Sequence, residues 1–242
     1  MIKRQLIKYI LSLSLFCLIA GCLFLSPSYG QETGLHTTLT WSTNSYVPAN
    51  YPGKRLPVPG SLIEVIADLE TRASTIRKLD FQWFLNDQLQ RQASGNGQRN
   101  FQFIAPNSPG SKLEVKLEAR EQGLRVASKE LTIKIVRPQV VIYAANNSFL
   151  ARNKYQLANH QQVKFSAVPY FFNIQNLNNL DFYWTLDDQA ANESDRQPDL
   201  LNLGVEIAGL TEAITQKLEL LVKNKEQANQ QAQTQTAITI IP

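Results

Sequence analysis

Ten residues, Leu79–Gln88, recur almost unchanged 101 positions later as Leu180–Gln189. Both copies fit the pattern L-D-F-x-W-x-L-[ND]-D-Q. In each copy the Leu, Phe, Trp and Leu residues occupy alternate positions, which is the period of a β-strand with one buried face. The repeat therefore predicts that the chain contains two copies of one small β domain.

The similarity extends beyond the motif. Strand-like segments flank it at matching positions in both halves of the chain: Leu62–Leu69 with Gln162–Val168, Lys112–Glu118 with Lys217–Lys223, and Leu131–Ile135 with Ala237–Ile241. Each unit is then about 105 residues long, the usual size of a seven-stranded sandwich domain. We expect one domain over residues 31–137 and a second over residues 138–242.

Hydrophobic alternation predicts individual strands in each half. For the first domain these are Thr37–Trp41, Leu62–Leu69, Phe81–Leu85, Gln88–Gln92, Asn100–Ile104, Leu113–Ala119 and Leu131–Val136. For the second they are Gln139–Tyr143, Gln162–Val168, Phe182–Leu186, Leu201–Ile207, Gln216–Val222 and Thr234–Ile241. The predicted class is all-β, with two β-sandwiches in tandem.

Four segments outside these strands carry expectations of their own. Ser94–Gly97 has the composition of a tight turn and predicts a hairpin between the fourth and fifth strands. The polar segment Ala190–Asp199 leaves the fourth strand of the second domain in question, and Leu210–Leu221 admits one short helix as an alternative to a strand. Asn224–Gln233, rich in Asn and Gln, is expected to be a mobile hairpin loop.

The first thirty residues have the arrangement of an export signal. Lys3, Arg4 and Lys8 precede an uncharged, Leu- and Ile-rich stretch. Small residues before the end of this stretch favour cleavage after Gly30. The alternatives are a lipoprotein acylated at Cys22 and an uncleaved membrane anchor, because about 20 apolar residues span a bilayer. The protein is thus expected to be exported, and to touch a membrane only through this N-terminal segment.

Charge and cysteine content narrow the function. Without the three basic residues of the signal the chain keeps 21 basic and 20 acidic residues, so the formal net charge falls from +4 to +1. This near balance argues against nucleic-acid binding, which needs a basic face. Cys17 and Cys22 both lie in the signal, so the domains after it contain no disulfide and depend on packing.

Trp83 and Trp184, each in the middle of a predicted strand, carry a resemblance to a known fold family. A central-strand Trp among alternating apolar residues, followed by [ND]-D, resembles the immunoglobulin-like class, and most closely its polycystic-kidney-disease (PKD) type. Both copies lack the glycines that follow the Trp in the PKD signature. The resemblance implies that both tryptophans are core markers and that the domains are spacers or binding modules of surface proteins. The segment Ser45–Lys54 also resembles part of exported bacterial two-domain proteins.

The sequence offers no catalytic constellation. After the signal there is no Cys, the two histidines, His36 and His160, lie far apart, and no nucleophile-elbow motif occurs. Zinc is not expected for lack of ligands. Asp187-Asp188 and the matching Asn86-Asp87 leave Ca²⁺ open as a cofactor, although adjacent Asx residues at a strand end more often form turn hydrogen bonds.

Aromatic loop residues are the candidates for partner binding. Loops at one end of a sandwich often bind partners, and such loops contain Tyr46, Tyr51, Tyr170, Phe171 and Phe172. For the last three, packing on a core or on the other domain is the favoured alternative, because three contiguous exposed aromatics favour aggregation.

We therefore expect a non-enzymatic exported surface protein that acts as a spacer or a protein-binding module, with an extracellular or envelope protein as partner. A carbohydrate-binding adhesion module, with a glycan as partner, is the alternative. The link between the domains contains Pro138 and neither Gly nor Ser, which predicts a stiff, end-to-end junction.

Overall fold

The computed structural model describes residues 35–144, 149–150, 153–191, 193–194 and 197–242. Cleavage after Gly30 and acylation of Cys22 lie outside these residues and stay predictions. Within them, no helix has the length and apolar character needed to cross a membrane. The described chain from Leu35 to Pro242 belongs to a single contiguous unit.

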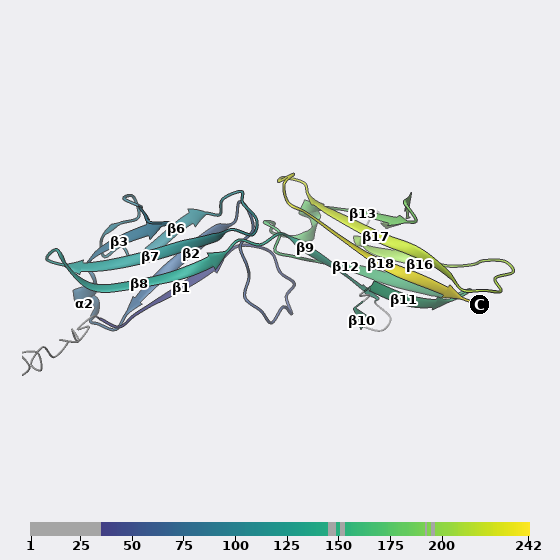
Figure 1. Ribbon diagram of the computed structural model, residues 1–242, viewed down its shortest axis with the longest axis horizontal. Coiled ribbons are helices and arrows are strands. Elements are labelled where there is room, and N and C mark those ends of the chain that lie inside the picture. Colours follow the sequence, from purple (N-terminus) through teal and green to yellow (C-terminus); the bar gives the residue numbers. More distant parts are fainter. Residues whose placement is uncertain (1–34, 145–148, 151–152, 192, 195–196) are drawn as a thin grey trace, which may run out of the picture. The chain divides into compact units, whose positions relative to one another are not determined.

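The first half forms two facing sheets (Figure 1). One contains β1 (Thr37–Thr43), β2 (Leu62–Leu69) and β6 (Asn100–Ile104) in the order β1-β2-β6. The other has the order β4-β3-β7-β8, with β5 also paired to β3; its strands are β3 (Asp80–Leu85), β4 (Gln88–Leu89), β5 (Gly95–Asn96), β7 (Lys112–Glu121) and β8 (Leu124–Lys134). A single helical turn, α2 (Ala73–Ile76), lies between β2 and β3.

Alternate residues of these strands fill the space between the sheets. Ile63, Val65 and Ala67 of β2 are fully buried, as are Phe81 and Trp83 of β3. Burying each large side chain stabilises the fold by about 1.5–3 kcal/mol. Burial of these apolar residues stabilises the sandwich without the disulfide that many sandwiches of this size contain.

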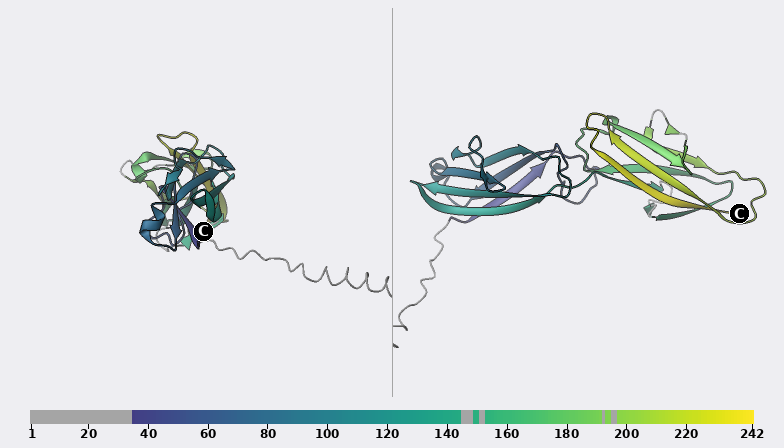
Figure 2. Two further views of the ribbon diagram at one scale, coloured as in Figure 1. Left: turned by 90° about the vertical axis from the view of Figure 1, so that its left-hand side faces the viewer. Right: turned by 45° about the horizontal axis from the view of Figure 1, so that its top comes forward.

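The second half repeats the plan with more strands. One sheet has the order β10-β9-β12-β16-β15, made of β9 (Gln139–Ala144), β10 (Phe149–Leu150), β12 (Gln162–Tyr170), β15 (Glu193–Ser194) and β16 (Gln197–Gly204). The other has the order β11-β18-β17-β13-β14, made of β11 (Asn153–Ala158), β13 (Leu180–Leu186), β14 (Gln189–Ala190), β17 (Ile214–Asn224) and β18 (Gln231–Ile241). A 3-10 turn, η1 (Leu177–Asn179), precedes β13. Figure 2 shows both sandwiches from two further directions.

The two tryptophans occupy equivalent buried sites. Trp83 is 0% and Trp184 2% exposed. The Trp83 indole Nε1 donates to the Gln98 carbonyl at 2.8 Å, and that of Trp184 to the Pro198 carbonyl at 3.1 Å. A buried indole N–H needs such a partner, and in both halves the partner is the backbone close to the next strand of the opposite sheet.

The strand before the tryptophan strand, β2 in the first half and β12 in the second, pairs with a strand that follows the tryptophan strand, β6 and β16 respectively. The tryptophan strand itself, β3 or β13, lies in the other sheet and pairs with the last hairpin. This exchange between sheets, with the Trp on the strand after the crossing, defines the immunoglobulin topology. The protein consists of two tandem immunoglobulin-like β-sandwiches, as the repeat predicts. The PKD subtype and the boundary between residues 137 and 138 stay predictions.

Two expectations for the first sandwich are wrong. The fourth strand is only β4, Gln88–Leu89, and Ser94–Gly97 forms no hairpin between it and β6. Gly95 and Asn96 instead pair with Phe81 and Asp80 of β3, while β6 pairs with β2 in the other sheet. The chain crosses between sheets here, so a local turn signal cannot report the pairing.

The predicted strand Gln216–Val222 is confirmed as part of β17, which pairs with both β13 and β18, so the helical alternative for Leu210–Leu221 is wrong. The fourth strand, in question over Ala190–Asp199, is as short as its counterpart β4: it is β14, Gln189–Ala190. The strand predicted to begin at Leu201, β16, begins at Gln197. The sequence analysis also missed β11, which pairs in parallel with β18 and places the buried Leu157 in the core.

The segment after the first strand is used differently in the two repeats. In the second sandwich it contains β11, which covers the outer edge of the last strand. In the first sandwich the corresponding loop, Asn44–Gly60, adds no strand to β8, and among the described strands β8 lies at the end of its sheet. This loop instead contacts the second sandwich.

We predict that Trp83→Ala and Trp184→Ala each destabilise mainly their own sandwich, by about 3–5 kcal/mol, because each removes a large buried aromatic side chain. Denaturant unfolding followed by probes specific to each sandwich measures the loss. Tyr183→Ala, on the same strand as Trp184 but with a 48% exposed side chain, is the control and should stay close to wild type. An unchanged transition in either Trp variant contradicts the prediction.

Candidate binding cleft at the junction

Loop Asn44–Gly60 forms a backbone connection to the second sandwich. The Tyr46 N–H donates to the Phe172 carbonyl at 2.6 Å, and the Phe171 N–H donates to the Tyr46 carbonyl at 2.7 Å. Tyr46 and Phe172 thus form an antiparallel bridge. The Tyr46 side chain packs against the core of the second sandwich, although it comes from the first.

Aromatic rings pack beside this bridge. The Tyr51 ring lies edge-on to Tyr170 at 5.6 Å and to Phe171 at 5.7 Å between centroids. Phe171 is 5% and Phe172 0% exposed, whereas Tyr46, Tyr51 and Tyr170 are partly buried. The structure therefore places the five candidate aromatics together, and it buries two of them. Their role in binding an external partner stays a prediction.

A buried glutamine completes the junction. The Gln230 Nε2 donates to the Pro59 carbonyl at 2.6 Å and to Gln227 Oε1 at 2.8 Å. Its Oε1 accepts from the Asn173 backbone N–H at 2.7 Å and from Asn224 Nδ2 at 3.1 Å. Gln230 is fully buried, and both its NH₂ group and its carbonyl oxygen are hydrogen-bonded, as buried polar groups usually are. One of its partners, Pro59, belongs to the first sandwich.

The hairpin predicted over Asn224–Gln233 is confirmed, and residues at its base are buried. It joins β17 to β18, and Asn224 is 3% and Gln230 0% exposed. Asn173 Nδ2 also donates to the Gly60 carbonyl at 3.1 Å, and Asn229 Nδ2 to Asn107 Oδ1 at 2.9 Å.

Gly60 has φ +82°, and a Cβ there would lie 3.0 Å from Gln227 Oε1. The tight turn against the hairpin thus favours glycine.

The outer part of the loop also packs on its own sandwich. Lys54 Nζ lies 3.6 Å from the centre of the Trp41 ring, a cation–π contact. Burial lowers the pKa of Lys54. The Ser45 hydroxyl donates to the Leu56 carbonyl at 2.8 Å across the base of the loop.

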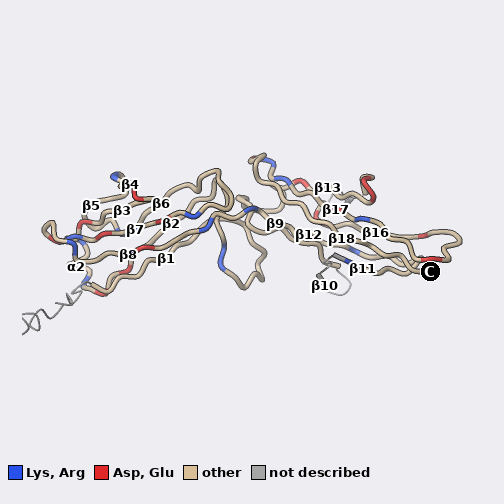
Figure 3. Tube along the Cα trace, in the orientation of Figure 1, with Lys and Arg blue, Asp and Glu red and all other residues tan. Residues whose placement is uncertain are grey.

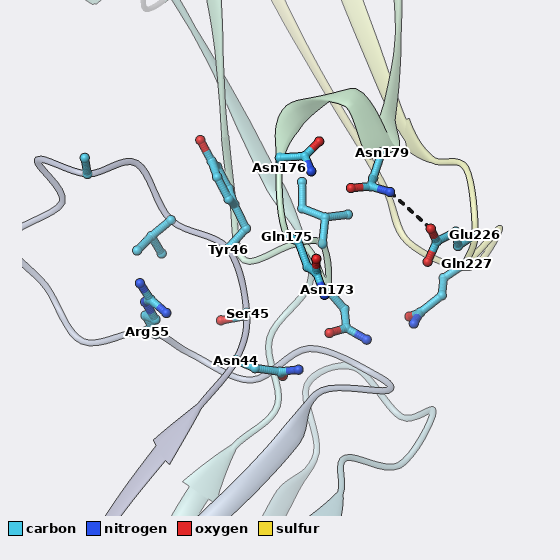
Figure 4. A pocket seen from close by; sticks show the side chains of 13 residues that line it. Asn44, Ser45, Tyr46, Arg55, Asn173, Gln175, Asn176, Asn179, Glu226 and Gln227 are labelled. Atoms are coloured by element: carbon cyan, nitrogen blue, oxygen red, sulfur yellow. Dashed lines mark hydrogen bonds between the residues drawn. The ribbon is translucent and has the colours of Figure 1, made fainter.

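A cleft of about 920 Å³ opens next to these contacts. Its lining side chains come from the loop, from the segment before β13 and from the β17–β18 hairpin (Figure 4). Six are amides: Asn44, Asn173, Gln175, Asn176, Asn179 and Gln227. Arg55 and Glu226 supply one charge of each sign, and Tyr46 supplies the aromatic surface.

Several of these polar groups are open to a ligand. The Asn44 and Asn176 oxygens accept from the backbone N–H groups of Leu62 and Asn178. Asn179 Nδ2 donates to Glu226 Oε1 at 3.1 Å. Within the described part of the chain no hydrogen bond engages the side chains of Gln175 or Arg55. The cleft thus presents both donors and acceptors.

The phenol of Tyr46 stays protonated at neutral pH. Burial raises its pKa, and the nearby Asp199 carboxylate raises it further. A protonated phenol both donates and accepts a hydrogen bond. The Tyr46 phenol is therefore a neutral polar group near Asp199 at neutral pH, and Tyr46 is one of the residues that line the cleft.

The paired Asx residues form turns. Asn86, Asp87, Asp187 and Asp188 all have positive φ, between 48° and 66°, in two-residue hairpin loops. The Asn86 and Asp187 side-chain oxygens accept from the backbone N–H groups of Glu114 and Lys217. Over the described residues, no group of three or more His, Cys, Asp and Glu side chains is placed to hold a metal ion.

Positively and negatively charged residues are interspersed along the described part of the chain (Figure 3). The densest cluster surrounds Glu118, which is 7% exposed and lies 3.1 Å from Lys116 Nζ and 2.9 Å from Arg120 Nη2. The hydrogen bond from Arg120, together with those two positive charges, lowers the Glu118 pKa despite burial. This cluster lies on a sheet face of the first sandwich, away from the cleft-lining residues.

Comparison with known proteins leaves the family open. No protein-family model matches the sequence, and no curated protein matches it. Among solved structures, the chain is similar to fibronectin(III)-like modules of Clostridium thermocellum CbhA, with 12% identity, a TM-score of 0.28, and 84% of this chain and 93% of that chain covered.

Two further structures are similar over most of the chain. Three N-terminal domains of the outer capsid protein Hoc of bacteriophage RB49 match with 11% identity and a TM-score of 0.43, over 85% of this chain and 59% of that one. The N-terminal Ig1-2 module of the Drosophila receptor phosphatase DLAR matches with 10% identity and a TM-score of 0.28, over 85% and 99%. The immunoglobulin-like fold follows from the strand order of the chain itself.

The sequence analysis missed the amide residues of the cleft. The signal was present: Asn173–Asn179 and Gln227–Gln230 are both rich in Asn and Gln. Two amide-rich segments 54 positions apart become one surface only when the β17–β18 hairpin lies beside the segment before β13. Spacing along the chain does not show this.

We predict that the junction loses stability in alkali because of Tyr170. Burial, followed by a side-chain hydrogen bond to Tyr143, raises the pKa of Tyr170 to about 12. The same phenol in the unfolded chain ionises near pH 10, so its contribution is complete below pH 10 and is lost as the pH rises to 12. Urea unfolding at a series of pH values should show a smaller decline for Tyr170→Phe. Tyr183→Phe, an exposed control, should match wild type; equal slopes for all three proteins contradict the prediction.

Proposed function

We propose that this protein is an exported, non-enzymatic protein of the cell surface or envelope, which acts as a spacer and as a binding module. The observation that carries the proposal is the junction. Both backbone groups of Tyr46 bond to the second sandwich, and the buried Gln230 bonds back to the first. A spacer has to keep its two domains in a fixed relation, and buried bonds of this kind oppose hinge motion.

The chemistry of the cleft supports binding without catalysis. Its lining includes one carboxylate, Glu226, and no His or Cys. Acid–base hydrolysis of a glycosidic bond uses a pair of carboxylates, and nucleophilic catalysis uses a nucleophile next to a base. His36 pairs with Glu70 at 3.1 Å on the exposed surface of the first sandwich, and neither residue belongs to the cleft.

The partner in this proposal is an extracellular or envelope protein, or a glycan. The near balance of positive and negative charge after the signal does not favour nucleic acid. Contact with a membrane, in this proposal, is made through the N-terminal segment alone.

Export predicts a processed N-terminus. Because Ser28 and Gly30 are small and follow Pro27, we expect the mature protein to begin at Gln31. Mass spectrometry of the N-terminus of the natively expressed protein measures this. An acylated Cys22 supports the lipoprotein form of export, and an intact Met1 on a protein that is not in the envelope fraction contradicts export.

The spacer role predicts a stiff junction. Small-angle scattering of the chain from Gln31 to Pro242 should give a narrow distribution of inter-domain distances. Gln230→Ala should broaden it, because the substitution leaves the Pro59 carbonyl and the Asn173 N–H without their partner, at roughly 1–3 kcal/mol for each unpaired buried group.

Gln233→Ala is the matched control, since Gln233 is an exposed residue of β18, the strand that begins directly after Gln230. It should leave the distribution unchanged. A broad distribution for the wild-type protein would overturn the spacer role. Identical curves for wild type and Gln230→Ala would show that Gln230 does not stiffen the junction.

A further inference from the structure

We propose that the junction cleft binds a neutral glycan chain. The inference rests on the proposed function as a binding module and names the ligand class of its site. It depends on four properties of the cleft: its charge, its hydrogen-bonding groups, its backbone and its size.

The cleft carries no net charge. Arg55 and Glu226 are the two charged side chains of its lining, and their formal charges cancel. An anionic ligand such as a nucleic acid or a sulfated glycan would call for a surplus of Arg and Lys. The apolar lining residues, Val47, Ala49 and Ile174, are too few for a lipid-like ligand. A neutral polar ligand fits this balance.

The open hydrogen-bonding groups match hydroxyl groups. Asn44 and Asn176 keep their NH₂ donors, Asn179 keeps its carbonyl oxygen, and Gln175 keeps both. A sugar hydroxyl donates one hydrogen bond and accepts others, so it pairs with either end of an amide. Tyr46, which also lines the cleft, adds aromatic surface against which the C–H groups of a sugar can pack.

The backbone of the cleft does not favour an extended peptide. Peptides that bind by strand addition need a strand edge with unpaired N–H and C=O groups. The strand-like residue in the cleft is Tyr46, and both of its backbone groups already bond to Phe171 and Phe172. What remains for a ligand is mainly side-chain amides, which suits a glycan better than a peptide.

The size of the cleft fits a chain of several sugars. Its volume of about 920 Å³ lies near the upper end of the range of roughly 300–1,000 Å³ for ligand sites. Since two sandwiches contribute lining residues, a bound glycan would also bridge the junction and hold it closed. Ligand binding and stiffness are therefore coupled.

The test is calorimetry and NMR titration of the chain from Gln31 to Pro242 with linear neutral hexasaccharides of glucose, mannose and xylose. We expect at least one to bind, with shifts confined to the cleft residues and a Kd that does not change between low and high salt. Gln175→Ala should weaken binding about 5-fold, the equivalent of one neutral hydrogen bond of about 1 kcal/mol. Arg55→Ala should weaken it by a similar factor or more.

Both substituted residues are exposed, and no hydrogen bond between described residues engages their side chains, so the fold should persist. Unfolding curves check this. Gln235→Ala and Arg91→Ala, exposed residues outside the cleft, are the matched controls and should bind as wild type does.

Three results would overturn the proposal. These are no binding of any neutral hexasaccharide at millimolar concentration, shifts that map outside the cleft, and tighter binding of a sulfated hexasaccharide or an unstructured peptide. The failure is distinguishable from failure of the proposed function, because N-terminal processing and the scattering of the junction are measured without any ligand.

Discussion

Buried polar groups have to find hydrogen-bond partners, and at this junction some of the partners come from the opposite sandwich. An unpaired buried group costs about 1–3 kcal/mol, so each bond from Gln230 to Pro59, or from Tyr46 to Phe172, is more easily kept than broken. Gly60 then takes the left-handed conformation that this turn requires. The arrangement of the loop, the hairpin and the cleft depends on these hydrogen bonds between the two sandwiches.

The segment after the first strand has a different role in each repeat. In the second sandwich the segment after the first strand gives β11, which satisfies the edge of β18 in parallel pairing. In the first, the corresponding loop bonds to the other sandwich, and the Val136 N–H, two residues after the end of β8, donates to its Pro57 carbonyl. An exposed strand edge is usually kept from aggregation by charge, and Glu130 and Lys134 lie on the exposed part of β8. The first sandwich therefore has no counterpart of β11 beside β8 among its described strands, and its loop forms the junction instead.

The cleft also depends on the contact of this loop with the second sandwich. Where the loop and the hairpin meet in dry contact, amides such as Gln230 are fully used. On the neighbouring segment before β13, the exposed amides of Gln175 and Asn176 line the cleft (Figure 4). Some hydrogen-bonding groups of the cleft amides are paired within the described part of the protein and others are not, so a ligand can form hydrogen bonds with the remaining groups.

The sequence by itself determined the duplication, the all-β class and the main strands, because alternation and a recurring Trp are local properties that survive in any arrangement of the chain. It also determined the burial side of β2, β3 and β7, where every second residue is apolar. Only the tertiary structure decided that Ser94–Gly97 pairs with β3, that Phe171 and Phe172 are buried, and that Asn173, Gln227 and Gln230 meet the loop around Gly60. These contacts join residues up to 171 positions apart. No periodicity along the chain encodes them, because they join the two sandwiches and depend on which polar groups each sandwich buries against the other.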